Sequence, residues 1–244
     1  MGCSMARESV EFNIQANEIV QCADNTQTVL NLSVNDTLDI SVELVENTSG
    51  ILVINVEGIG RLNLVLNCLE GSSFDYLWVN KSDTSLVVNE TVYLGKQASL
   101  RTNYGEMTSG EHEKTTVFHM IGERSVVDVR SASITFNKMS WDMSVEHEAK
   151  YTEANLRNYA IGLENSEFVL KVIGHILNGN SGSQTHQTSR VLNVSDKITA
   201  VVYPELLIDE NDVAASHACT MGQPDPEQVY YLQARGLPER EALS

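Results

Sequence analysis

The short segment Ser216-His217-Ala218-Cys219 places an imidazole and a thiol two residues apart, and both groups can ligate a metal ion. If this segment is a β-strand, His217 and Cys219 point to the same face, about 7 Å apart along the strand. Two ligands do not complete a metal site, so a second chain would have to supply the others. The spacing alone favours a plainer interpretation, in which His217 is a hydrogen-bonded strand residue and Cys219 fills the core.

Two other parts of the sequence combine imidazole with carboxylates. The segments Glu111-His112-Glu113 and Glu146-His147-Glu148 could bind a divalent cation, although solvated loop charges are the more common origin of such clusters. The cysteines Cys3, Cys22 and Cys68 lack both C-x-x-C and zinc-finger spacing. No Walker A, G-x-S-x-G or H-E-x-x-H motif occurs, so no motif indicates a nucleotide site or a common hydrolase.

The charge of the chain disfavours several classes of partner. It has 16 Lys and Arg against 33 Asp and Glu, which gives a formal net charge of −17. A phosphate backbone or an anionic membrane surface would be repelled, so we expect neither nucleic acid nor a membrane as a partner. No apolar run is long enough to span a bilayer, and the first residues lack the apolar core of a secretory signal. We therefore expect a cytoplasmic protein.

Between about residues 28 and 205 the sequence has the alternation of short β-strands. Runs such as Leu38–Val45 and Ile51–Val56 alternate aliphatic residues with polar ones, and long helical periodicity is missing. Similar turn segments open at Gly71, Gly95 and Gly122, which lie 24 and 27 residues apart. That repeat length suits one coil of a β-solenoid, but an ordinary β-sandwich also has regularly spaced turns, so the repeat alone leaves both open.

The pattern changes near the C-terminus, where helix signals appear. Asp225 is a suitable N-cap, Pro226 fits the first helical position, and Gln228 completes a capping box. Gly236 follows an arginine and marks the end of this helix. Pro238 begins a second helix, which the last residues of the chain cut short.

We expect three parts along the chain. Residues 1–27 form a lead-in segment, residues 28–222 form the β core, and residues 223–244 form a short helical segment. The candidate ligands His217 and Cys219 then lie at the end of the β core, immediately before the first helix.

The C-terminal residues match a known family in order. They are Pro204-Glu205-Leu206, Asp212-Val213, Ser216-His217, Thr220, Gly222, the helix 227–232 and its close Ala234-Arg235-Gly236-Leu237, with weaker agreement at 184–187 and 190–195. This string resembles the end of the SufB/SufD family, the scaffold subunits of the SUF iron–sulfur cluster assembly machine, and it is nearer to SufD than to SufB. Over residues 1–170 the resemblance is one of strand character.

The resemblance implies a mainly β protein built as a right-handed parallel β-helix with short C-terminal helices, which favours the solenoid over the sandwich. It implies a non-catalytic scaffold that pairs with a SufB-like scaffold or with a second copy of itself. It also implies contact with a SufC-like ABC ATPase through the helices after the β-helix. The family's helical N-terminal domain has no counterpart here, and its C-terminal helical region is short.

The resemblance also gives His217 a role. By its place in the motif it is the interface ligand that faces a cysteine of the partner scaffold. Iron or an Fe–S cluster would be held there transiently, and we expect no stably bound cofactor. Relatives often carry a cysteine two residues before this histidine, where this chain has Ala215. Cys219, two residues after it, is a candidate second ligand that no family position supports.

An enzyme on the same architecture is the alternative. A β-helix polysaccharide lyase or glycosidase would need a cleft with at least two carboxylates or a calcium site. Asp75, Asp83 and Glu90 are available, although nothing in their spacing singles them out. The aromatic content of 6 % is low for a sugar-binding cleft, so we expect the chain not to be an enzyme.

Overall fold

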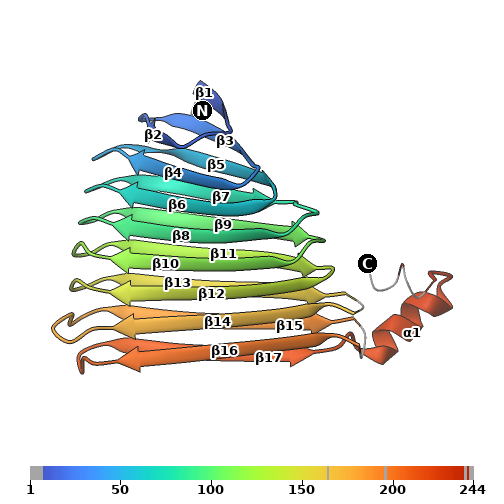
Figure 1. Cartoon of the computed structure of the whole chain (residues 1–244). Coiled ribbons are helices and arrows are strands. Elements are labelled where there is room, and N and C mark those ends of the chain that lie inside the picture. The colour runs from blue at the N-terminus through green and yellow to red at the C-terminus, as the bar shows by residue number, and fades with distance from the viewer. Residues whose placement is uncertain (1–7, 164, 195–196, 239–240, 242–244) are drawn as a thin grey trace, which may run out of the picture.

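The chain forms a parallel β-solenoid, seen in a computed structural model that describes residues 8–163, 165–194, 197–238 and 241. Successive strands alternate between two sheets, so the nine odd-numbered strands of this part make a first sheet and the eight even-numbered strands make a second (Figure 1). All the strand pairings are parallel. The predicted stack of coils is therefore confirmed, and a sandwich of antiparallel hairpins is excluded.

The strands are of similar length, mostly eight to ten residues. The first sheet contains β1 (Glu8–Ile14), β3 (Thr26–Val34), β5 (Ser49–Gly58), β7 (Ser73–Asn80), β9 (Ser99–Thr108), β11 (Val126–Thr135), β13 (Glu153–Gly162), β15 (Gln184–Asn193) and β17 (Ala214–Gly222). The second contains β2 (Glu18–Cys22), β4 (Thr37–Leu44), β6 (Gly60–Cys68), β8 (Leu86–Leu94), β10 (His112–Met120), β12 (Lys138–His147), β14 (Glu167–Ile176) and β16 (Thr199–Ile208).

Coil length grows toward the C-terminus. Thr26 pairs with Gly50, Ser99 with Val126, and Glu153 with Gln184, and these partners lie 24, 27 and 31 residues apart. The strands keep nearly constant length, so the added residues lie in the connections between them. The glycine spacing in the sequence followed the true coil length because the turns recur once in each coil.

The interior between the two sheets is filled by every second residue of each strand. In β3, Leu30 and Leu32 are at most 1 % exposed, whereas Asn31 between them is half-buried on the outer face. Stacking aligns the inward residues of successive coils, as in the column formed by Leu30, Ile54 and Trp78. This burial, at about 25 cal/mol per Å² of apolar surface, is the main force that holds the coils together.

One turn recurs in the left-handed backbone conformation. The residues Asn47, Gly71, Gln97, Arg124 and Tyr151 all have positive φ, between 56° and 69°. Each of these residues donates its backbone N–H to a carbonyl in the corresponding turn of the next coil. These stacked turns therefore continue the hydrogen bonding of the sheets around the corner of the solenoid.

The C-terminal helix α1 (Pro226–Ala234) begins and ends where the sequence indicated. The side chain of Asp225 accepts a hydrogen bond from the N–H of Glu227, and Gly236 beyond the helix has φ of 96°. The second helix expected from Pro238 falls mostly on residues outside the described part of the chain. No helix among the described residues is both long and apolar enough to cross a membrane.

At the other end, the strands begin earlier than the sequence pattern indicated. β1 and β2 lie within residues 1–27, the range expected to be a lead-in segment, and both pair with the strands that follow. Their outward residues are charged or polar and their inward residues are few, which made the alternation hard to recognise. As a division into domains, the ranges 1–27, 28–222 and 223–244 stay a prediction.

Candidate functional site

The two candidate ligands lie on β17, the last strand of the first sheet. The register pairs His217 with Gln187 and Cys219 with Ser189 on β15. Gln187 and Ser189 are buried inward-facing residues, and neighbours in register share a face of the sheet. His217 and Cys219 therefore both face the interior side of the solenoid, as their spacing in the sequence predicted.

That side is uncovered at β17, because no described strand follows β17 in the sheet. Every residue of β17 is exposed, whereas alternate residues of β15 are buried. On β16, the last strand of the second sheet, the inward residues Val202 and Leu206 are only partly buried. The C-terminal end of the solenoid thus presents apolar interior residues together with an imidazole and a thiol (Figure 1).

As a metal site this arrangement is half complete. Within the described residues there is no group of three or more His, Cys, Asp or Glu side chains that could hold a metal ion. Imidazole and thiolate are suitable ligands for iron, but the thiolate is the form that binds, and partial burial raises the pKa of Cys219. His217 and Cys219 fit iron as two donors of a shared site and require others from outside this part of the chain.

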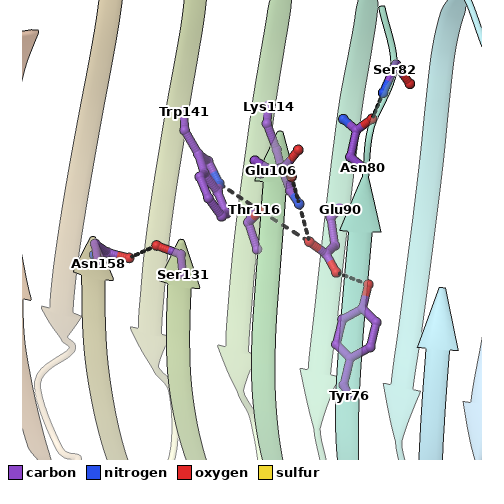
Figure 2. A network of polar contacts seen from close by, with 10 residues as sticks. All are labelled: Tyr76, Asn80, Ser82, Glu90, Glu106, Lys114, Thr116, Ser131, Trp141 and Asn158. Atoms are coloured by element: carbon purple, nitrogen blue, oxygen red, sulfur yellow. Dashed lines mark hydrogen bonds and ion pairs between the residues drawn. The ribbon is translucent and has the colours of Figure 1, made fainter. Parts of the chain in front are cut away.

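The residues inside the coils become more polar toward this end. One inward column runs from Trp78 through Tyr104, Ser131, Asn158 and Ser189 to Cys219. Ser131 donates a hydrogen bond to Asn158 at 2.7 Å, as Figure 2 shows. The column that ends at Cys219 therefore differs from the apolar columns of the first coils.

A buried ion cluster lies in the middle of the solenoid (Figure 2). Lys114 Nζ is 2.8 Å from Glu106 Oε1 and 3.8 Å from Glu90 Oε2, and all three side chains are at most 2 % exposed. Tyr76 donates its hydroxyl proton to Glu90 at 2.8 Å, and burial raises the pKa of this hydroxyl, so it remains a donor. The Lys114 ammonium also lies 3.8 Å from the ring centre of Trp78.

This cluster weakens the case for a carbohydrate-active enzyme. Glu90 points into the closed interior, where a polymeric sugar has no access. Asp75 lies on the outer face and pairs with Arg101 at 2.8 Å. The carboxylates named for a catalytic cleft therefore do not share one.

The two carboxylate–imidazole segments are also divided between faces. His112 and His147 point inward and are at most 3 % exposed, whereas Glu113 and Glu146 point outward. Burial lowers the pKa of His147 to about 4, which keeps its ring neutral. Adjacent residues of a strand face opposite ways, so neither segment is a chelating cluster.

Sequence reasoning missed a histidine–carboxylate ladder on the outer face of the second sheet. His175 on β14 contacts Glu146 on β12 through Nδ1 at 2.7 Å and Asp209 after β16 through Nε2 at 3.1 Å. On neighbouring coils His119 contacts Glu148 at 2.6 Å. These partners are 29 to 34 residues apart in sequence, so only the coil length brings them together.

Comparison with known proteins decides the family. The model of the SufBD core domain of the SUF system for FeS cluster assembly matches residues 21–244. The chain belongs to the SufBD family of iron–sulfur cluster assembly proteins. Within the family it is similar to the iron–sulfur cluster assembly protein SufD of Bacillus subtilis, with 29 % identity over 150 residues.

Two further relatives are similar over shorter stretches. A SufBD family protein of Synechocystis is 22 % identical over 127 residues, and one of Mycobacterium bovis is 38 % identical over 63 residues. The matches cover 61 %, 51 % and 25 % of this chain but only 34 %, 26 % and 16 % of the three relatives. The chain thus spans about a third or less of the curated relatives it matches.

Proposed function

We propose that this SufBD protein is a SufD-like, non-catalytic scaffold that holds iron or a nascent Fe–S cluster between itself and a second scaffold. The observation that carries the proposal is the position of His217 and Cys219 on the uncovered end of the solenoid. Two donors on an exposed terminal strand suit a site that a second chain completes. The cluster is cargo that is assembled and passed on, so its ligands need not form a closed site.

The partner scaffold would pack against this same end. β16 and β17 each pair with a strand on one side only, which leaves backbone donors and acceptors on the other side. Ile208 and Met221 at this end are 38 % and 42 % exposed. A SufB-like scaffold or a second copy of this chain would cover these residues and supply the missing ligands.

The ATPase partner is proposed to bind at α1. No residue of this helix is buried, and Tyr230 and Tyr231 are 72 % and 56 % exposed. Exposed tyrosines on a rigid, capped helix are typical anchors of protein interfaces. A SufC-like ABC ATPase is the occupant that the family resemblance favours.

The remaining parts of the proposal follow from charge and family. With a net charge of −17, the chain is a poor ligand for nucleic acid or an anionic membrane. The cytoplasm as its location stays a prediction. The carbohydrate-active alternative is not favoured, because Glu90 is closed inside the coils and Asp75 lies outside them.

The test of the scaffold role is an assembly assay with co-expressed SufB-like and SufC-like partners. His217→Ala is expected to preserve folding and partner binding and to lower the yield of assembled Fe–S cluster severalfold. Ser216→Ala is the matched control, because its side chain lies on the opposite face of the same strand. Full cluster assembly by the His217→Ala complex, with partners bound normally, would remove His217 from the site and leave the scaffold role standing. Failure of the wild-type chain to bind either partner would overturn the scaffold role itself.

A further inference from the structure

Three buried polar residues lie next to β17 on the inward face of β15. Thr185, Gln187 and Ser189, which we call the polar floor, are at most 2 % exposed. The register pairs Gln187 with His217 and Ser189 with Cys219. Neighbouring strands of a sheet lie about 4.8 Å apart, so each candidate ligand has one polar-floor residue as its nearest inward neighbour on β15.

Each residue of the polar floor has a buried polar atom without a partner among the described residues. These atoms are Thr185 Oγ1, Gln187 Oε1 and Ser189 Oγ. The other end of the Gln187 amide is occupied, because Nε2 donates to the backbone carbonyl of Glu205 at 3.2 Å. A buried polar group without a hydrogen bond costs about 1–3 kcal/mol. Three such groups on one strand face, beside an uncovered coil, indicate that their partners come from that coil or from what it binds.

The opposite sheet leaves space for the polar floor. Gly174 lies on the inward face of β14, and a Cβ at this position would come within 2.8 Å of Thr185 Oγ1 and 2.9 Å of Gln187 Nε2. Gly174 is not among the residues with positive φ, so its backbone does not require glycine. The missing side chain is therefore explained by the room that Thr185 and Gln187 occupy.

We propose that Gln187 is a positioning residue for His217: its Oε1 accepts the N–H of one ring nitrogen and leaves the other nitrogen free to bind iron or a cluster. A neutral imidazole carries one N–H and one lone pair, and the partner of the N–H decides which nitrogen is the ligand. Histidine ligands usually donate their second N–H to a carbonyl or carboxylate in this way. Ser189 offers its hydroxyl to Cys219 by the same geometry. This inference rests on the proposed role of His217 as a ligand.

The tautomer of His217 tests this contact without any metal. Long-range ¹H–¹⁵N spectra of the ¹⁵N-histidine-labelled full chain report which ring nitrogen carries the proton, with the His217 signal assigned from His217→Ala. At about pH 8, above the ordinary imidazole pKa near 6.5, the wild-type ring is expected to be mostly one tautomer. Gln187→Leu removes the acceptor at similar volume and is expected to shift His217 to the mixed ratio of an unfolded histidine.

Three further variants make the test specific. Gln187→Glu keeps an acceptor at the same reach and is expected to restore the single tautomer. Thr188→Val changes the adjacent outward residue of β15 and is expected to leave the His217 spectrum unchanged. Gly174→Ala disturbs the polar floor from the other sheet without touching β17, and it is expected to act like Gln187→Leu.

The outcomes separate this inference from the proposed function. An unchanged tautomer ratio in folded Gln187→Leu and Gly174→Ala proteins would overturn the positioning role, whatever the assembly assay gives. If Gln187→Leu does not fold, Gly174→Ala alone decides. If the tautomer responds as expected but His217→Ala still assembles clusters, the contact is real and His217 is not the ligand.

Discussion

Lys114 on β10 and Glu106 on β9 belong to different sheets, yet their charged atoms are 2.8 Å apart inside the solenoid. The second carboxylate, Glu90, lies one coil before Lys114 in the same sheet, at 3.8 Å. The cluster thus connects the two sheets and two successive coils through groups that are almost fully buried. A slip of either strand would leave these charges unpaired, so the cluster favours one register over others.

Lys114→Met is therefore expected to lower the free energy of unfolding by about 3–5 kcal/mol, because it leaves two carboxylates buried without their cation. Lys96→Met is the control, since Lys96 pairs with Glu70 at 3.0 Å on the surface, with side chains more than half exposed. An exposed pair of this kind is worth about 0–1 kcal/mol. Urea unfolding of the two variants measures the difference, and equal losses would contradict the role of the buried cluster.

The His175 ladder predicts a pH dependence of stability. Burial alone would lower the pKa of His175, but hydrogen bonds and charge from Asp209 and Glu146 outweigh it and raise the pKa above its ordinary value. Other titratable groups near this face are His147 inside β12, whose proximity to His175 lowers the pKa of His147, and the His119–Glu148 pair. The folded state thus binds the His175 proton more tightly than the unfolded state does.

The stabilisation from His175 is fully present below the unfolded pKa, near 6.5, and is lost as pH rises through the higher folded pKa. His175→Gln is expected to lose stability relative to wild type near pH 6 and to approach wild type above that folded pKa. Thermal unfolding at a series of pH values measures this difference. A constant gap between the two proteins across the series would contradict the charge-based account.

The sequence could predict the repeating elements but not the contacts between coils. Alternation in runs such as Ile51–Val56 reports burial directly, so strands and their inward faces were predictable. Glu111-His112-Glu113 was harder to interpret as a cluster, because its meaning depends on the segment being a strand, which divides it between faces. The partners Gln187 and His217 lie 30 residues apart, and their pairing depends on the exact length of one coil.

The stacked turns allow a stabilising substitution. Gln97 has φ of 58° and is exposed, and its backbone N–H donates to the carbonyl of Glu123. Glycine adopts this conformation without the steric cost of a side chain, so Gln97→Gly is expected to add about 0.5–1 kcal/mol. The reverse change at the equivalent turn, Gly71→Ala, should destabilise, since a Cβ there would meet Asn47 Oδ1 at 2.4 Å. Urea midpoints of both variants check the pair, and a loss of stability in Gln97→Gly would contradict the strain argument.

The open C-terminal end predicts association of the chain when it is alone. β17 offers an unpaired strand edge beside exposed apolar residues, and such an edge is a template for pairing with another chain. We expect sedimentation velocity at high micromolar concentration to show a dimer. Met221→Lys places a charge on the inward face of β17 and is expected to weaken the dimer, whereas Thr220→Lys, on the outer face of the same strand, is the control.

A strict monomer for the wild-type chain would contradict homodimerisation and leave a SufB-like partner as the expected occupant of this end. A dimer that Thr220→Lys disrupts and Met221→Lys does not would place the contact on the outer face of the sheet instead. Because His217 and Cys219 share their face with Met221, only pairing through the inward side brings a second chain close enough to complete the candidate iron site.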